Sequence, residues 1–204
     1  MNFIVFPGQG SQKISMGKDL SDNFIEAKEV FEEVNEALDF NLTKIMWGDD
    51  EKALSLTYNA QPALMACGVA SFRVLKKITR KKLPQLADYV CGHSLGEYTA
   101  MTVSEVFSLK ECSKLLRLRG NAMQKAVPLG KGAMAAFIGA DISTTLDILA
   151  QVQSFGICDI ANDNSDGQVV ISGDLEAVEN AINLTKQYGI KRAVLLPVSA
   201  PFHC

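Results

Sequence analysis

Apolar residues alternate along the chain between short unbroken runs and helical spacing. Short runs predict strands over residues 3–6, 86–91, 133–138, 157–160, 169–172 and 192–198. A spacing of three to four residues predicts helices over residues 21–38, 109–127, 143–153 and 175–188, and from residue 95 onward. Ser21 or Asp22 is a natural N-cap for the first helix. Pro62 suits a first helical turn, so we expect it to open a mostly buried helix that continues through Val74.

The order of the predicted elements changes after Pro128. From there the pattern is βαββαβ, which is the ferredoxin-like arrangement. We therefore expect a small ferredoxin-like subdomain over residues 128–197. It interrupts a large α/β subdomain made of residues 1–127 and 198–204.

Composition is ordinary for a protein of 204 residues, with 48% hydrophobic residues, 21% charged residues and a net charge of −3. This balance argues against a nucleic-acid binder, and no apolar run is long enough to cross a membrane. The first residues have no basic region and reach a turn at Pro7, unlike a signal peptide. The five cysteines lack metal-ligand spacing, so we expect small core residues in a reducing cytoplasm and no metal site.

The sequence Gly92-His93-Ser94-Leu95-Gly96 follows a predicted strand and leads into a helix. This order is typical of a nucleophile elbow, where glycines leave room for a strained turn that exposes the serine hydroxyl. The N–H groups after the serine then point at the oxyanion that forms when it attacks a carbonyl. The motif predicts acyl transfer through Ser94.

A serine nucleophile needs a base that takes its proton, and the chain contains only two histidines. His93 adjoins Ser94, and neighbours on a tight turn project in different directions, so His93 is the poorer candidate. His203 follows the last predicted strand. By elimination, it is the candidate base.

Two further segments each allow two interpretations. Gly8-Gln9-Gly10 lacks the third glycine of a dinucleotide-binding loop, so it is either a wall of an oxyanion hole or an ordinary turn. Arg119 lies on a helix with an apolar opposite face. It is either solvated or a bidentate clamp for a carboxylate, and spacing leaves both interpretations open.

Together these motifs resemble one family, the malonyl-CoA:acyl carrier protein transacylases of fatty-acid synthesis. The matching stretches follow the family order over the whole chain. They are Phe6-Pro-Gly-Gln-Gly-Ser-Gln12, Gln61-Pro-Ala-Leu64, Gly92-His-Ser-Leu-Gly-Glu-Tyr98, Arg119-Gly-Asn-Ala-Met-Gln124, Gly132-Ala-Met134, Asn164 with Gly167-Gln-Val-Val170, and Pro197-Val-Ser-Ala-Pro-Phe-His-Cys204.

The resemblance implies roles for individual residues. Ser94 would be the nucleophile, His203 its general acid/base, and Arg119 the residue that binds the free carboxylate of the malonyl group. The backbone N–H groups of Gln9 and Leu95 would form the oxyanion hole. The residues expected to line the pocket are His93, Met123 and Asn164.

The family fold implied by the resemblance is an α/β-hydrolase-like core with a ferredoxin-like subdomain. The implied reaction transfers malonyl from malonyl-CoA, through an O-malonyl serine, to the phosphopantetheine thiol of holo-acyl carrier protein. No permanently bound cofactor is implied, and we expect a cytoplasmic protein that is monomeric when complete. Because the carrier protein is acidic, a basic docking surface is expected, either Lys191 with Arg192 or the basic cluster of residues 73–82.

The chain departs from the family pattern after His203. Family members continue for about another third of their length, and that part supplies the backbone carbonyl that orients the catalytic histidine. A truncated product and a partner chain that supplies the rest both explain the difference. In either case we expect reduced activity, and an unpaired apolar face where the missing helices pack.

The sequence also allows two other functions. A serine esterase or thioesterase would use Asp159, Asp163 or Asp174 as the acid of a Ser–acid–His triad. Product analysis separates it from a transacylase, because a hydrolase releases the free acid. A catalytically impaired fragment that only binds carrier protein or CoA would retain that binding after Ser94→Ala and would form no covalent adduct.

Overall fold

The structure, a computed structural model, describes residues 1–128, 130–196, 198 and 201–204. Its contacts divide the chain into two units, Met1–Ala122 and Met123–Cys204. The boundary predicted from the sequence lies at residue 128, and residues 198–204 are predicted to belong to the large subdomain. In the structure Phe202 instead packs with Met134 and Val170 of the second unit. The division into subdomains stays a prediction, and its limit at Pro197 lies outside the described residues.

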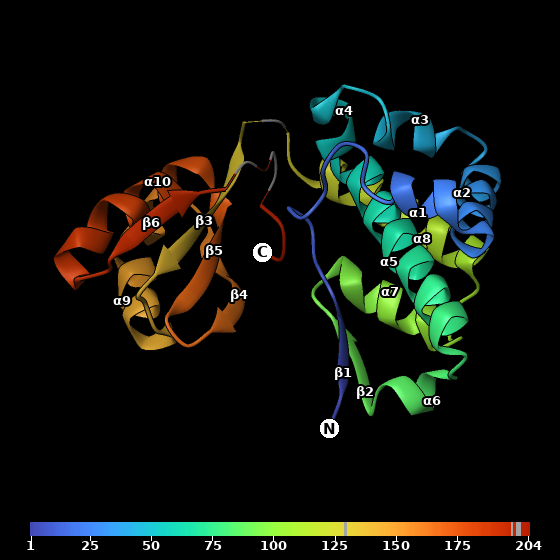
Figure 1. Ribbon diagram of the computed structural model, residues 1–204. Coiled ribbons are helices and arrows are strands. Elements are labelled where there is room, and N and C mark those ends of the chain that lie inside the picture. Colours follow the sequence, from blue (N-terminus) through green and yellow to red (C-terminus); the bar gives the residue numbers. More distant parts are fainter. Residues whose placement is uncertain (129, 197, 199–200) are drawn as a thin grey trace. The chain divides into compact units, whose positions relative to one another are not determined.

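A pair of parallel strands, β1 (Phe3–Phe6) and β2 (Tyr89–Gly92), forms the sheet of the first unit (Figure 1). Alternate side chains of the two strands point to opposite faces. On one face Ile4, Phe6 and Val90 pack into the core. On the other face Phe3, Val5 and Tyr89 are 56%, 64% and 55% exposed, and the rings of Phe3 and Tyr89 stack with their centroids 5.2 Å apart.

Helices build the rest of the first unit around the long helix α5, which packs against α2 and α7. Its core includes Phe31, Met65 and Leu95, all nearly inaccessible to solvent. Burying one such side chain contributes roughly 1.5–3 kcal/mol. The helices are α1 (Lys18–Asn23), α2 (Ile25–Leu38), α3 (Leu42–Met46), α4 (Glu51–Ser55), α5 (Thr57–Thr79), α6 (Leu83–Leu86), α7 (Leu95–Val103) and α8 (Leu109–Ala126), of which α8 continues past Ala122 into the second unit.

Two predicted helix starts are wrong. The helix predicted over residues 21–38 is broken at Phe24, whose backbone is extended, so neither Ser21 nor Asp22 caps α2. Phe24 packs against the core, and tertiary contact outweighs local spacing at this position. The second error concerns Pro62, which lies inside α5 because that helix already begins at Thr57.

The second unit follows the predicted order of strands and helices. Its four strands form an antiparallel sheet in the order β4-β5-β3-β6. Helices α9 and α10 pack on one face, where Phe137, Ile148 and Ile171 are fully buried (Figure 1). On the opposite face Met134 and Phe202 form a smaller cluster. The elements are β3 (Gly132–Ile138), α9 (Ile142–Val152), β4 (Cys158–Ser165), β5 (Gln168–Asp174), α10 (Leu175–Leu184) and β6 (Arg192–Leu195), with short 3-10 helices at Gln153–Phe155 and Thr185–Tyr188.

Candidate active site

Ser94 lies between β2 and α7 in a backbone conformation that serine rarely adopts. Its φ is 52° and its ψ is −107°. Such a conformation costs roughly 1–3 kcal/mol and persists only where the surrounding structure holds it. A strained serine between a strand and a helix is the geometry that the Gly-x-Ser-x-Gly motif predicts.

Two glycines make this turn possible by close backbone approach. A Cβ on Gly92 would lie 2.0 Å from the carbonyl carbon of Gly96. A Cβ on Gly96 would lie 2.3 Å from the carbonyl oxygen of Phe6, at the end of β1. Any side chain at either position would therefore push the turn away from β1 or open it.

The loop after β1 lies beside the turn that carries Ser94. The N–H of His93 donates to the carbonyl oxygen of Phe6 at 3.1 Å, and a Cβ on Gly8 would lie 2.5 Å from His93 Nδ1. The loop is also tied to the start of α5, because Gln9 Nε2 donates to Thr57 Oγ1 at 3.2 Å. Leu95 is the first residue of α7, where a helix leaves N–H groups without intrahelical acceptors. The oxyanion hole of Gln9 and Leu95 stays a prediction, and the segments that carry both residues lie at the turn.

Arg119 reaches the serine from helix α8. Its Nη2 donates to Ser94 Oγ at 2.9 Å, and its Nη1 donates to Gln61 Oε1 at 2.7 Å. The guanidinium carbon also lies 5.6 Å from the ring centroid of Tyr98. A half-buried cation is thus held at the serine hydroxyl, where it can attract an anionic group of a substrate.

Sequence reasoning missed Arg117, which ties α8 to the start of α5. Its Nη1 donates to the carbonyl oxygen of Tyr58 at 2.9 Å and to Asn59 Oδ1. Its guanidinium carbon lies 4.6 Å from the ring centroids of both Phe40 and Tyr58, and burial lowers its pKa. The available signal was Pro62, because a proline inside a helix has no N–H for the carbonyl four residues earlier, which is that of Tyr58.

Helix α8 also meets α5 by direct backbone contact. A Cβ on Gly120 would lie 2.5 Å from Tyr58 Cα and 2.8 Å from Tyr58 N. Only glycine allows this approach, which sets how far α8 stands from α5. The side chain of Arg119, next in the chain, is thereby brought within reach of Ser94.

The remaining predicted site residues are distributed as follows. His93, in the first unit, is exposed beside the turn. In the second unit, His203 is exposed with φ of 63°, Asn164 is exposed on β4, and Met123 packs partly buried near Phe202. The pairing of Ser94 with His203, and a pocket that includes Met123 and Asn164, stay predictions.

Three thiols with raised pKa values, Cys67, Cys112 and Cys158, are not activated. Burial raises the pKa of Cys67 and Cys112. Burial, together with Cys204 and nearby carboxylates, raises the pKa of Cys158 to about 12. A raised pKa keeps a thiol protonated at neutral pH, and the protonated form is a poor nucleophile. These three cysteines therefore do not compete with Ser94 for acyl groups.

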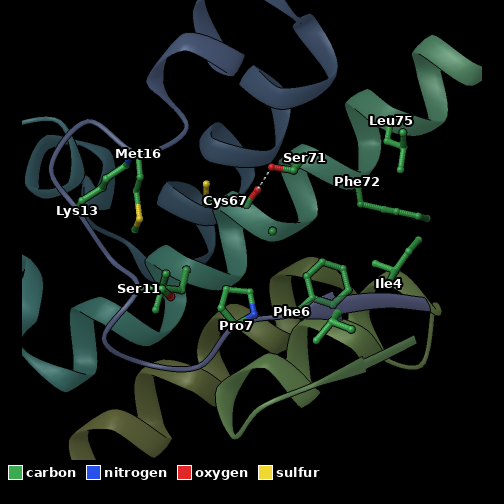
Figure 2. A pocket seen from close by; sticks show the side chains of 13 residues that line it. Ile4, Phe6, Pro7, Ser11, Lys13, Met16, Cys67, Ser71, Phe72 and Leu75 are labelled. Carbon is green, nitrogen blue, oxygen red and sulfur yellow. Dashed lines mark hydrogen bonds between the residues drawn. The ribbon is translucent and has the colours of Figure 1, made fainter. Parts of the chain in front are cut away.

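A separate apolar groove of about 420 Å³ runs between β1 and α5 (Figure 2). Figure 2 shows Ile4 and Phe6 on β1 and Phe72 and Leu75 on α5 lining it. Neither Ser94 nor Arg119 lines it. The groove is therefore distinct from the arrangement around the serine.

Residues 1–128, 130–196, 198 and 201–204 also bear on two other kinds of site. This part of the chain holds no cluster of three or more His, Cys, Asp or Glu residues suited to a metal ion. None of its helices combines the length and apolar character needed to cross a membrane.

The sequence is similar to those of known acyl transferases. The model of the acyl transferase domain family matches residues 3–203. A malonyl CoA-acyl carrier protein transacylase of Bacillus subtilis is 43% identical over 200 residues, which cover 98% of this chain and 62% of that protein.

Solved structures of malonyltransferases are also similar to this chain. An acyl-carrier-protein-S-malonyltransferase from Bartonella henselae superposes with a TM-score of 0.95 at 50% identity, covering 100% of this chain and 65% of that one. A malonyl-transacylase solved in complex with a type II PKS acyl-carrier protein superposes with a TM-score of 0.93 at 40% identity, covering 100% of this chain and 65% of that one.

This chain thus spans just under two thirds of the length of these relatives. The family match extends over nearly every residue and includes the strained serine, both glycines of its turn and Arg119. The chain therefore belongs to the acyl transferase domain family.

Proposed function

We propose that the protein transfers a malonyl group from malonyl-CoA to the phosphopantetheine thiol of an acyl carrier protein. The observation that carries the proposal is the position of Arg119, whose Nη2 lies 2.9 Å from Ser94 Oγ. A cation at the nucleophile suits an acyl group that ends in a carboxylate. The names of the relatives point to the same substrate and acceptor.

In the first half-reaction Ser94 Oγ attacks the thioester carbonyl of malonyl-CoA while His203 takes the hydroxyl proton. The tetrahedral oxyanion accepts hydrogen bonds from the N–H groups of Gln9 and Leu95. When the intermediate collapses, the C–S bond breaks and the CoA sulfur takes the proton from His203. The product is an O-malonyl serine.

In the second half-reaction the phosphopantetheine thiol attacks the ester carbonyl and gives its proton to His203. The C–O bond to Ser94 breaks, and the serine oxygen takes the proton back from His203. The two acyl transfers through one serine give ping-pong kinetics.

Arg119 supplies selectivity in this reaction. The malonyl carboxylate forms charge-assisted hydrogen bonds with the guanidinium, whereas an acetyl group leaves that cation without an anionic partner. His93, Met123 and Asn164 would line the remainder of the acyl pocket.

The architecture proposed for this function is an α/β-hydrolase-like core with a ferredoxin-like subdomain. The strand–turn–helix at Ser94 supports the first part, and the strand order β4-β5-β3-β6 with two helices on one face supports the second. Exposed Lys191 and Arg192 are the proposed docking residues for the acidic carrier protein. We further propose that the complete enzyme is a cytoplasmic monomer without a permanently bound cofactor.

The test is intact-mass spectrometry after brief incubation of the chain with malonyl-CoA, and separately with acetyl-CoA. The unmutated chain is expected to gain one malonyl group and little acetyl, and Ser94→Ala is expected to gain neither. Adding holo-carrier protein should then remove the adduct and produce malonyl-carrier protein.

Three other results would favour a different function or a different nucleophile. Rapid release of free malonate without an acceptor would favour a serine esterase or thioesterase. Carrier-protein binding with no adduct in the unmutated chain would favour a fragment that only binds. A malonyl adduct that persists in Ser94→Ala would overturn the role of this serine.

A further inference from the structure

Gln61 is completely buried, at 0% exposure, and it contacts Arg119 directly. It lies in the first part of α5, and its Oε1 accepts a hydrogen bond from Arg119 Nη1 at 2.7 Å. The other terminal nitrogen of the guanidinium donates to Ser94 Oγ. Because the guanidinium is a planar group, holding Nη1 at Gln61 determines where Nη2 points.

Pro62, the next residue, allows a second hydrogen bond between α5 and α8. Since proline has no N–H, the carbonyl of Tyr58 lacks its usual donor within the helix. Arg117 Nη1 donates to this carbonyl at 2.9 Å. Arg117 and Arg119 stand two residues apart on α8, so the Tyr58 carbonyl and Gln61 hold this helix at two adjacent points.

We propose that Gln61 is a positioning residue that aims the Arg119 guanidinium at the acyl group on Ser94, with Pro62 securing α8 through Arg117. The proposal rests on the proposed malonyl transfer and adds to it the source of selectivity for carboxylated acyl groups. Gln61 has no direct contact with substrate in this account. Its effect travels through the orientation of Arg119.

The chemistry of the amide explains why glutamine suits this position. A neutral oxygen orients the guanidinium and leaves its positive charge available to the substrate carboxylate. A glutamate would form a buried ion pair with Arg119 and compete with that carboxylate. A methionine of similar length would keep most of the packing and lose the acceptor.

The first experiment measures rates of adduct formation with malonyl-CoA and acetyl-CoA for the unmutated chain, Gln61→Glu, Gln61→Met and Pro62→Ala. In Gln61→Met the ratio of malonyl to acetyl rates is expected to fall by about tenfold, the size typical of losing one hydrogen bond to a charged group. In Gln61→Glu the ratio is expected to fall because the new carboxylate pairs with Arg119 and competes with the malonyl carboxylate. In Pro62→Ala the restored N–H competes with Arg117, so the ratio should fall by about threefold while the midpoint of thermal unfolding stays equal or rises.

The matched control is Asn35→Leu, which removes another polar side chain of the first unit that is tied into the fold. Asn35 Nδ2 donates to Thr43 Oγ1 at 2.9 Å, and the N–H of Thr43 donates to Asn35 Oδ1 at 3.1 Å. This variant should melt earlier and keep the unmutated malonyl-to-acetyl ratio. A ratio that falls equally in Asn35→Leu would reduce the role of Gln61 to general stability and overturn the proposal.

A second measurement separates this proposal from the proposed function. Side-chain ¹H–¹⁵N spectra report rotation of the Arg119 guanidinium without any substrate, with Arg119→Lys to assign its signals. Rotation should be slow in the unmutated chain and fast in Gln61→Met. Unchanged rotation would overturn the positioning role even where malonyl transfer is established. Absence of any malonyl adduct in the unmutated chain would overturn the proposed function. In that case, a guanidinium that rotates slowly in the unmutated chain and fast in Gln61→Met would still support the positioning of Arg119.

Discussion

Both faces of strand β3 are buried, whereas the β1–β2 pair buries one face only. On β3, residues Ala135 and Phe137 face the helices, and Met134 faces the cluster that contains Phe202. On the β1–β2 pair, Phe3 and Val5 remain exposed. Parallel sheets ordinarily have both faces covered, whereas within the described residues the outer face of the β1–β2 pair is exposed.

The difference shows where each unit concentrates its stability. The antiparallel sheet is covered by helices on one face and by the cluster with Phe202 on the other, and among its described residues no non-glycine residue has a positive φ. The parallel pair instead holds the strained turn at its carboxyl end, with support from α5, α7 and α8. Removing side chains should therefore have unequal effects in the two sheets.

The largest expected effect is at Phe137, which is completely buried. Phe137→Ala should lower the free energy of unfolding by about 4 kcal/mol, because it removes buried apolar surface and leaves a cavity. Phe3→Ala, at a ring that is 56% exposed, should cost less than about 1 kcal/mol. Urea unfolding followed by circular dichroism measures both, and equal losses would contradict the contrast between the sheets.

The next effect is at Gly96. Gly96→Ala should cost about 3 kcal/mol and abolish adduct formation, because the new methyl group would collide with the carbonyl oxygen of Phe6. The control is Gly189→Ala at φ of 70°, where no other atom lies within 4 Å of the added Cβ. That change should cost about 1 kcal/mol, the strain of a left-handed alanine alone. Thermal unfolding of the pair checks the difference, and a harmless Gly96→Ala would exclude the tight approach.

A smaller effect is expected at Ser94, where introducing a glycine should stabilise the protein relative to introducing an alanine. Ser94→Gly should be more stable than Ser94→Ala by about 1 kcal/mol, because glycine adopts a positive φ without strain. Both variants should lose the malonyl adduct. Denaturation midpoints of the two variants make the comparison, and an equally stable pair would indicate that the turn stores no strain at this residue.

The smallest effect concerns thiol reactivity in the two sheets. Cys91, on the exposed face of β2, should react with iodoacetamide at pH 8. Cys158, with a pKa of about 12, is the neutral thiol at that pH, and its reaction rate should rise about tenfold for each pH unit up to pH 11. Peptide mass mapping from pH 7 to 11 follows both sites. Early labelling of Cys158 would show that β4 opens to solvent.

The strained turn was largely predictable from sequence, because Gly92 and Gly96 bracket a serine after an apolar strand. The order of elements in the second unit was predictable for a similar reason, since each apolar run has a distinct period. The break at Phe24 was not, because spacing alone predicts one continuous helix there. Only the packed core selects the extended backbone at that residue.

The partners of Arg119 required the structure. Spacing on α8 left two interpretations of this arginine, and the choice depends on Gln61, which is 58 positions away in sequence. The role of Arg117 also depends on a residue far away in the sequence, so it was not predicted. Pro62 did indicate that the Tyr58 carbonyl lacks a donor within its own helix. Hydrogen bonds between distant helices leave no period in the sequence, so only isolated residues such as Pro62 hint at them.

The donor missing at Pro62 has a consequence for how related sequences vary. A lineage that replaces this proline gives the Tyr58 carbonyl a donor within its own helix and relaxes the demand for an arginine at position 117. A lineage that loses Arg117 first leaves that carbonyl without a donor, and a replacement of Pro62 would then be favoured. Positions 62 and 117 should therefore covary across the family, as a record of one hydrogen bond that either helix can supply.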